Sequence, residues 1–332
     1  MNRQPDLLVT GTLTWETSAL VDRLPDDGRV DWAGDDALYR GAKRIIEGGG
    51  GSAANVAVAA ARAGLLVTFV GRAGDDDAGH RCLAALHSEG IRTDIELVPG
   101  RRTKRSLLLI ESNSARVQFR VAVPPLLPPP LPAADMDVEM VRDARWLHLD
   151  RVSEAAPEIL AIRGGHSTSL DLHDLPTRPS ARRRLVSMLP WIGILQIREA
   201  AVMELRALLD GTSESVAYST PGLTEALPID DATIIHELEA LSGRVPKIVV
   251  TRGERGAAAV ETGGVPFLVG PVAQKLVLDP TGAGDAFAAA LIVGMLAGRG
   301  FPDACCKAAE AGSRCCGWFG ARYDRFLEVD SR

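Results

Sequence analysis

Short apolar runs alternate along most of this chain with longer stretches in which apolar residues recur at helical spacing. Runs of three to five apolar residues that stop at a glycine or a polar residue are typical of buried strands, and alanine-rich stretches that stop at a glycine are typical of helices. The strands predicted in this way are residues 7–10, 66–70, 145–149, 192–195, 248–251 and 276–278. The predicted helices are residues 53–63, 78–88, 286–297 and 303–317.

This alternation of strands and helices predicts an α/β fold, in which helices cover both faces of a mostly parallel central sheet. Two stretches break the rhythm. Residues of about 14–48 contain short runs and turns, and residues of about 103–123 alternate like a β-hairpin that turns at 112–114. A proline-rich connector, residues 124–132, follows the hairpin. We therefore expect one domain over residues 1–332, with the two stretches forming a small inserted β-sheet lid.

The composition changes this expectation little. The 332 residues are 46% hydrophobic and 24% charged with a formal net charge of -6, which is typical of a globular domain without a concentrated basic face. We expect no binding to nucleic acid, since that needs such a face. The sequence contains no apolar signal region and no long uncharged apolar run, so no membrane span is expected. Five cysteines, an odd number, argue against a disulfide framework and favour the reducing cytoplasm.

The most informative segment is the turn DPTGAGDAF at residues 279–287, which follows the predicted strand 276–278. A glycine-rich turn that leads into a helix points several backbone N–H groups at one spot, where they favour an anion. A bound phosphate would repel the carboxylate of Asp285, which suits a base that accepts a proton from an attacking hydroxyl. On spacing alone, Asp285 could equally be a helix N-cap. The P-loop pattern GxxxxGK[ST] is absent from the sequence.

This turn resembles the C-terminal signature DTxGAGD of the ribokinase family, also called the PfkB carbohydrate kinase family, and departs from it only at Pro280. The resemblance spans residues 7–320. It implies a ribokinase-like three-layer α/β/α sandwich, with Asp285 as the catalytic base. The anion hole implied by the resemblance consists of the amides of Gly282, Ala283 and Gly284.

A second glycine-rich run, GGGGSAAN at residues 48–55, leads into the predicted helix 53–63. It fits a loose dinucleotide-binding pattern, but residues 43–47 before it show no clear strand, which counts against that interpretation. The run resembles the N-terminal signature of the same family. That resemblance implies that Gly50, Gly51 and Asn55 bind the sugar. The alternative is a flexible loop in which Asn55 is an ordinary residue of the first helical turn.

Two acidic residues complete the substrate side that the resemblance implies. Glu16 lies five positions after Gly11, where many relatives carry an aspartate that contacts the substrate. Asp150 ends the segment LHLD, where sugar-binding relatives often carry an acid. A solvated charge on the lid is the alternative for Glu16, and the role of Asp150 stays open.

On the nucleotide side, residues 248–256 resemble the VVTxGxxG strand and turn of the family, which implies that Thr251 and Gly253 lie beside ATP. Gln196 and Glu199 resemble the NxxE motif with Gln in place of Asn, and Glu199 would hold a magnesium-bound water. Asp279 corresponds to a monovalent-cation ligand of some relatives, with a carbonyl from Gly320. The six histidines show no spacing such as HExxH, so no protein-bound transition metal is expected.

Together these motifs predict an ATP-dependent kinase that transfers the γ-phosphoryl group to a hydroxyl of a sugar or sugar-like substrate. The expected cofactors are ATP and Mg²⁺, with K⁺ as the monovalent cation that Asp279 would bind. A nucleoside or a vitamin-like alcohol is an alternative substrate, and a homologue that binds sugar or nucleotide without catalysis is an alternative function. As in the family, a homodimer through the lid is the expected assembly.

Overall fold

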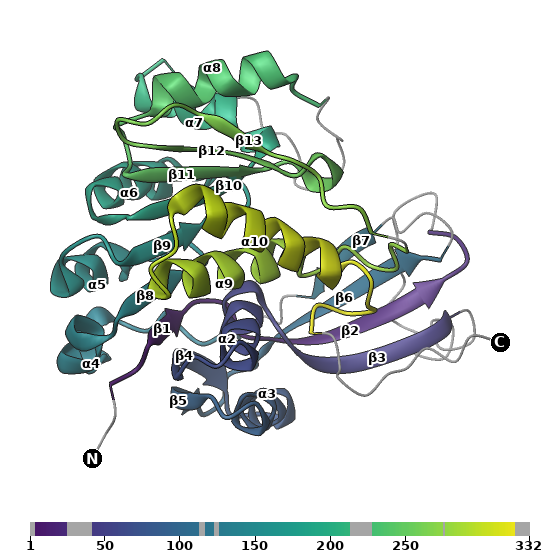
Figure 1. Ribbon diagram of the computed structural model, residues 1–332. Helices are drawn as coiled ribbons and strands as arrows, with labels where there is room; N and C mark the ends of the chain where they lie inside the picture. Colours follow the sequence, from purple (N-terminus) through teal and green to yellow (C-terminus); the bar gives the residue numbers. More distant parts are fainter. Residues whose placement is uncertain are drawn as a thin grey trace.

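A computed structural model describes residues 4–24, 42–112, 117–122, 126–212, 228–274 and 276–322 of the chain. In these residues nine strands form one large sheet in the order β13-β12-β11-β10-β9-β8-β1-β4-β5 (Figure 1). Its strands run parallel except β12, which is antiparallel to both of its neighbours. The nine strands are β1 (Leu7–Thr10), β4 (Val67–Gly74), β5 (Arg92–Val98), β8 (Trp146–Leu149), β9 (Thr168–Asp171), β10 (Ile194–Arg198), β11 (Lys247–Thr251), β12 (Ala257–Glu261) and β13 (Phe267–Val269).

Helices cover both faces of this sheet, so the molecule has three layers (Figure 1). One hydrophobic core lies between the sheet and α4 (Val138–Asp143), α5 (Ala156–Arg163), α6 (Pro179–Met188), α7 (Val202–Leu209) and α8 (Asp231–Leu241). A second core lies on the other face, under α2 (Ser52–Arg62), α3 (Asp77–Ser88), α9 (Ala283–Leu296) and α10 (Phe301–Cys315). Strands buried on both faces explain the continuous apolar runs of the sequence, such as Leu7 to Val9, which are fully buried.

The two interrupting stretches form a separate small sheet beside the layers (Figure 1). In the described residues it has four strands in the order β3-β2-β6-β7. They are β2 (Thr14–Val21), β3 (Ala42–Gly50), β6 (Lys104–Glu111) and β7 (Val117–Ala122). Strands β2 and β6 are parallel, whereas the pairs β2–β3 and β6–β7 are antiparallel. Opposite Glu16 of β2 stand Gly48 on one side and Ser106 on the other.

The predicted fold class is confirmed, as are most of the predicted elements. Two details are wrong. Residues 276–278 are not a strand: Leu276 and Val277 are exposed, and the amide of Leu278 donates to the carbonyl of Cys316. Residues 43–47 do form a strand, as part of β3. The pattern of the sequence does not reveal this strand, because it is rich in charged residues and glycines, which are rare in strands. Since β3 pairs antiparallel with β2, the glycine run is still not part of a parallel dinucleotide-binding unit.

Parts of the lid prediction, residues 25–41, 113–116 and 123, lie outside the described residues, as do residues 124–125 of the proline-rich connector. In the described part of the chain, none of the helices is long and apolar enough to cross a membrane.

Candidate active site

A cleft of about 1270 Å³ lies between the small sheet and the carboxyl ends of the parallel strands. One part of its lining comes from β2 and β6, and another comes from residues near the ends of β1, β8, β9, β10 and β11. Residues of α2, α9 and α10 line it as well. Ligands of open α/β sheets bind at this edge, where loops leave the carboxyl ends of the strands. The first turn of α9 faces the same cleft, through residues 282–285.

The glycine-rich turn starts α9 three residues earlier than predicted, at Ala283. Gly282 is the N-cap, with φ of 82°, and a Cβ there would come within 2.8 Å of the Cα of Ala321, so only glycine fits. The amide of Ala283 already donates to the carbonyl of Pro280 at 3.2 Å. Among the described residues, the amides of Gly282, Gly284 and Asp285 meet no acceptor. Of the three amides predicted for the anion hole, that of Ala283 is engaged, whereas those of Gly282 and Gly284, like that of Asp285, meet no acceptor in the described residues.

The carboxylate of Asp285 is 7% exposed and points across the cleft to α2. Its Oδ1 accepts a hydrogen bond from Ser52 Oγ at 2.6 Å, and its Oδ2 accepts one from Asn55 Nδ2 at 2.7 Å. Because no side-chain bond caps α9, the N-cap alternative for Asp285 is wrong. These two donors, one on each oxygen, hold the carboxylate in one orientation.

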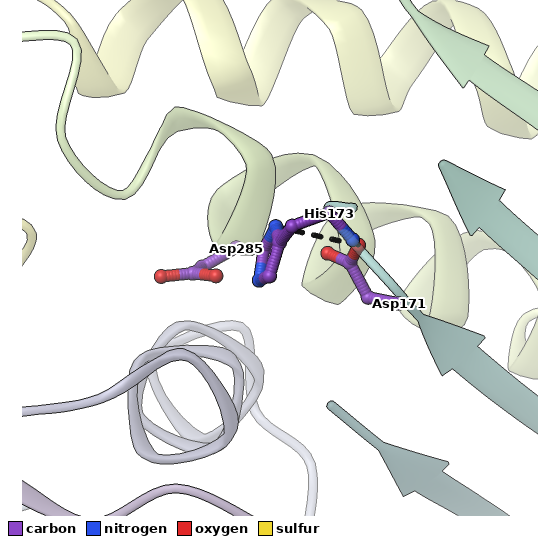
Figure 2. A group of neighbouring side chains, drawn as sticks. All are labelled: Asp171, His173 and Asp285. Atoms are coloured by element: carbon purple, nitrogen blue, oxygen red, sulfur yellow. Dashed lines mark hydrogen bonds and ion pairs between the residues drawn. The ribbon is translucent and has the colours of Figure 1, made fainter. Parts of the chain in front are cut away.

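Figure 2 shows a histidine between Asp285 and a second buried aspartate. His173 Nε2 lies 2.9 Å from Ser52 Oγ, and its Nδ1 lies 3.5 Å from Asp171 Oδ1. Since the hydroxyl proton of Ser52 points at Asp285, Nε2 of His173 must be the donor of its bond to Ser52. A chain of contacts therefore runs from Asp171 through His173 and Ser52 to Asp285.

The electrostatics of this chain follow from burial and close charges. Burial raises the pKa of Asp171 to about 6, although His173 opposes this. Burial by itself would lower the pKa of His173, but the carboxylates of Asp171 and Asp285 raise it above its usual value. His173 has a left-handed backbone with φ of 51°, which is uncommon for a residue other than glycine. Such local strain is often found at functional sites.

The ligand atoms of Asp171, His173 and Asp285 lie within 4.8 Å of one another, so these residue types could hold a metal ion. Both oxygens of each carboxylate already accept hydrogen bonds. Asp171 accepts from Gln196 Nε2 at 2.9 Å and from the amide of His173 at 3.1 Å, while Asp285 accepts from α2 as described. Hydrogen bonds therefore hold the cluster together on their own.

The predicted sugar residues of the glycine run surround Asp285. Asn55 is buried between two partners: its amide donates to Asp285, and its Oδ1 accepts from Arg322 Nε at 2.9 Å. Gly51 is the N-cap of α2 with φ of 94°, and a Cβ there would lie 2.5 Å from the carbonyl oxygen of Thr12. A Cβ at Gly50 would lie 2.8 Å from Glu16 Oε2. Gly51 and Asn55 line the cleft, and Gly50 gives Glu16 room beside it.

Glu16 lines the cleft, so the alternative of a solvated lid charge is wrong. Its Oε2 accepts a hydrogen bond from Ser106 Oγ at 3.3 Å. Burial raises the pKa of Glu16 to about 7, against the lowering effect of the nearby Arg322 and with a further rise from Asp285. Glu16 is therefore close to half protonated at neutral pH, and can donate or accept a hydrogen bond.

Asp150 also lines the cleft and joins three segments of the chain. Its Oδ2 accepts the amides of Thr12 at 2.9 Å and Ala53 at 3.2 Å, and its Oδ1 pairs with Arg151 Nε at 3.2 Å. Although burial favours the protonated form, Arg151 and the bonds to Thr12 outweigh it and lower the pKa of Asp150. A charged Asp150 thus fixes the N-terminus of α2 against the loop after β1.

The residues predicted for the nucleotide side line the other end of the cleft. Gln196 Nε2 donates to Asp171 and to the carbonyl of Gly284 at 3.1 Å, so it supports the first turn of α9. Glu199 pairs with Arg252 Nε at 2.9 Å through Oε1 and with Arg255 through Oε2. The carboxylate of Glu199 is therefore engaged by two arginines. Thr251 and Gly253 also line this end, and Thr251 Oγ1 donates to the carbonyl of Ile197.

Asp279 lies outside the cleft lining and is fully buried. Its Oδ1 accepts the amide of Thr281 at 2.8 Å, and its Oδ2 accepts the amide of Gly320 at 2.9 Å. Gly320 thus contributes its N–H group, not a carbonyl as predicted. This arrangement ties the C-terminal loop to the glycine-rich turn.

Four residues of the site were not predicted from the sequence: Ser52, Lys104, Asp171 and His173. Ser52 lies inside the glycine run at residues 48–55, directly before the predicted helix. That position was the one sign in the sequence that Ser52 belongs to the site. Asp171 ends a four-residue strand, β9, that is too short and polar to be recognised by its pattern, and His173 follows it. Ser52, Asp171 and His173 make contacts with distant parts of the chain that the sequence does not show.

The chain is similar to several known proteins. The family model described as "pfkB family carbohydrate kinase" matches residues 31–170 and 176–325. A fructokinase of Klebsiella pneumoniae is 29% identical over 299 residues, which cover 83% of this chain and 87% of that protein. A ribokinase of Bacillus subtilis is 29% identical over 280 residues, which cover 82% of this chain and 83% of that protein.

Among solved structures, an adenosine kinase of Sinorhizobium meliloti superposes with a TM-score of 0.75 at 20% identity, covering 96% of both chains. The ribokinase of Arabidopsis thaliana complexed with ribose and ATP superposes with a TM-score of 0.66 at 23% identity, covering 96% of this chain and 95% of that chain. At this identity, the likeness shows a common fold.

Proposed function

The chain belongs to the pfkB family of carbohydrate kinases, and on that premise we propose that it transfers the γ-phosphoryl group of ATP to a sugar hydroxyl that Asp285 deprotonates. The observation that carries this proposal is the position of Asp285. Its carboxylate is oriented by Ser52 and Asn55, and it stands at a helix N-terminus whose amides at Gly282, Gly284 and Asp285 meet no acceptor in the described residues. A base and an anion site therefore adjoin one another in the same cleft.

The reaction follows from this arrangement. The sugar hydroxyl gives its proton to Asp285 while its oxygen forms a bond to the γ-phosphorus, and the bond between that phosphorus and the bridging oxygen breaks to release ADP. The amides of Gly282, Gly284 and Asp285 would stabilise the charge on the transferred group. Because these amides are fixed by the start of α9, they need little reorganisation during the reaction.

Ser52 and Asn55 act on the orientation of the base. Both donate to Asp285, which leaves its remaining lone pairs for the substrate hydroxyl. His173 donates to Ser52 and so directs the hydroxyl proton of Ser52 toward Asp285. The residues expected to hold the sugar itself are Glu16, Gly50, Gly51, Asn55 and Asp150, and all of them except Gly50 line the cleft.

We place ATP in the other end of the cleft, along Thr251, Gly253 and the turn that precedes α9. ATP would bring Mg²⁺ on its phosphates, where the ion neutralises charge. Glu199 is engaged by Arg252 and Arg255, so we assign it the support of these arginines and no magnesium-bound water. Each oxygen of Asp279 accepts one amide and keeps a further lone pair, so K⁺ at Asp279 stays a prediction.

The test of this function is the stoichiometric conversion of a sugar and ATP into a sugar phosphate and ADP. The purified protein is incubated with Mg-ATP and a panel of pentoses, hexoses, sugar acids, sugar phosphates and nucleosides. ADP is measured by a coupled assay and the new phosphate ester by ³¹P NMR. We expect ADP release to depend on one class of sugar. Binding of ATP without ADP release on any member of the panel would contradict the proposal.

The homodimer through the small sheet stays a prediction. Size-exclusion chromatography with light scattering checks it, because a dimer and a monomer differ twofold in mass. A monomeric protein at micromolar concentration would contradict it.

A further inference from the structure

A second cavity of about 440 Å³ adjoins the sugar end of the cleft. Thr12, Lys104 and Arg151 line both spaces, so these three residues stand where the two adjoin. The second cavity lies among the proline-rich segment 127–131, the loops after β1 and β8, and the start of α6. A ligand in the cleft can therefore reach Lys104 and Arg151.

Basic side chains dominate the second cavity. Arg72, Lys104, Arg151, Arg178 and Arg184 line it, and Glu154 is the one acidic residue of its lining in the described part of the chain. Two of the cations have partners, because Arg72 pairs with Glu96 at 2.6 Å and Arg151 pairs with Asp150 at 3.2 Å. The side chains of Lys104, Arg178 and Arg184 have no partner within the residues that the structure describes.

Lys104 is the cation placed to meet a substrate. It begins β6 opposite Thr14, and along that strand Lys104, Ser106 and Leu108 all line the cleft, as the period of a strand requires. Ser106 on the same face binds Glu16, so Lys104 and Glu16 face the same space. Burial lowers the pKa of Lys104 and the positive charge of Arg151 lowers it further, against the opposing effect of Asp150 and Glu16.

A partly buried ammonium beside a second cation is unfavourable unless an anion accompanies it. Asp150 and Glu16 favour the charged form of Lys104, but neither forms an ion pair with its ammonium in the described residues. Arg151 keeps donors to spare, since its guanidinium has five N–H groups and contacts Asp150 and the hydroxyl of Thr12. The junction therefore offers a guanidinium, and an ammonium without an ion-pair partner in the described residues, to the same ligand group.

We propose that the sugar substrate carries an anionic group, a carboxylate or a phosphate, which Lys104 and Arg151 bind where the cleft meets the second cavity. This inference rests on the proposed function, since it names the substrate class of the same site. The sugar spans the cleft with its reacting hydroxyl at Asp285 and its anionic group at Lys104. Arg178 and Arg184 at the far side of the second cavity add a positive field that draws the anion in.

The test compares each anionic sugar with its neutral counterpart. Aldonates, uronates and 2-keto-3-deoxyaldonates represent the carboxylate, and hexose and pentose monophosphates represent the phosphate. For each, kcat and KM are measured with Mg-ATP, and the Kd is measured by calorimetry without ATP. We expect an anionic sugar to exceed its neutral counterpart in kcat/KM by about 10- to 100-fold, the usual range for a hydrogen-bonded charge. Preference for a sugar acid identifies a carboxylate, and preference for a sugar phosphate identifies a phosphate.

Two variants of Lys104 and one control make the assignment specific. Lys104→Met should raise KM and Kd for the anionic sugar about 10- to 100-fold while kcat changes little, because the interaction is already made in the ground state. Lys104→Arg keeps the charge and should recover most of the affinity. Lys307→Met removes an exposed lysine of α10 that pairs with Glu310 outside the cleft, and should leave both constants unchanged.

The outcomes separate this inference from the proposed function. Turnover confined to neutral sugars and unchanged in Lys104→Met overturns the anionic substrate and leaves the kinase standing. In a second outcome, an anionic sugar binds in calorimetry, Lys104→Met loses this binding, and no sugar is turned over. This result supports the anion site and contradicts the kinase. Failure of every anionic sugar to bind overturns the inference.

Discussion

At the scale of single residues, the site depends on how one carboxylate is held. Asp285 and its turn are adjacent in the sequence, so their pattern indicated either a base beside an anion site or a helix N-cap, and the resemblance to the ribokinase family favoured the base. Ser52 and His173 were not predicted, because they reach this base only through contacts across 233 and 121 positions of the chain. The engagement of Glu199 by Arg252 and Arg255 was hidden for the same reason.

Ser52 gives the first prediction at this scale. Ser52→Ala removes the 2.6 Å donor to Asp285 and the contact to His173, which leaves the base held by Asn55 alone. We expect kcat to fall about 10- to 100-fold, the range for a hydrogen bond to a charged group, with the Kd of ATP unchanged. Ser187→Ala, which changes an exposed serine of α6, is the matched control. Equal kcat values for the two variants would show that Ser52 does not orient the base.

Glu16 gives a prediction about pH. Its pKa of about 7 in the folded protein exceeds the usual value of 4.5, so the folded state binds the proton more tightly than the unfolded state. The stability that this proton supplies is complete below pH 4.5 and is lost as the pH rises to 7. Glu16→Gln is neutral at every pH. It should therefore gain stability relative to the wild type from pH 5 to pH 8, by up to about 3 kcal/mol.

Urea denaturation of the wild type and of Glu16→Gln at pH 5 and at pH 8 measures this difference in stability. A stability difference that stays constant from pH 5 to pH 8 would mean that Glu16 ionises normally.

At the scale of elements, the anion site is made by the way α9 begins. The sequence predicted the helix at residue 286, but the structure starts it at Ala283, and this places the amides of Gly284 and Asp285 in the first turn. Helix propensity could not predict this start, since Gly282 and Gly284 are poor helix formers. The close packing of neighbouring segments decides it: a Cβ at Gly312 of α10 would come within 3.0 Å of the carbonyl oxygen of Ala283.

A glycine pair tests this packing. Gly282→Ala and Gly298→Ala place the same side chain at φ of 82° and 76°, but only the first meets other atoms, at 2.8 Å from Ala321 Cα. In both variants the left-handed backbone should lower the free energy of unfolding by about 1 kcal/mol. In Gly282→Ala the clash should lower it by about 1–3 kcal/mol more. Urea denaturation compares them. Equal losses would show that the turn before α9 can move away from the C-terminal loop.

At the scale of the whole molecule, the cleft unites segments from both sheets and from the C-terminal loop. The alternation of strands and helices predicted the central sheet and its two helical layers, since each element carries its own periodicity. The C-terminal loop carries no such period, and its contribution was predicted only as a carbonyl of Gly320. In the structure it supplies the amide of Gly320 to Asp279 and the guanidinium of Arg322 to Asn55.

The hydrogen bond from the C-terminal loop to Asp279 leads to a prediction about stability. Asp279→Asn replaces one accepting oxygen by an N–H₂ group, so the amide of Thr281 or of Gly320 loses its buried acceptor. We expect the free energy of unfolding to fall by about 1–3 kcal/mol, and kcat to fall with it as the turn loosens. Asp303→Asn, at an exposed position of α10, serves as the control. If both variants keep wild-type stability, the loop does not depend on Asp279.

The central claim is that Asp285 takes the proton of the sugar hydroxyl, and the kcat of Asp285→Asn tests it most directly. Asparagine has nearly the same shape but cannot act as the base. With the preferred sugar and saturating Mg-ATP, we predict that kcat falls by about 10²- to 10⁴-fold, while the Kd of ATP measured by calorimetry stays within about twofold. A kcat within about tenfold of the wild type, in a variant of unchanged melting temperature, would contradict the assignment of Asp285 as the base.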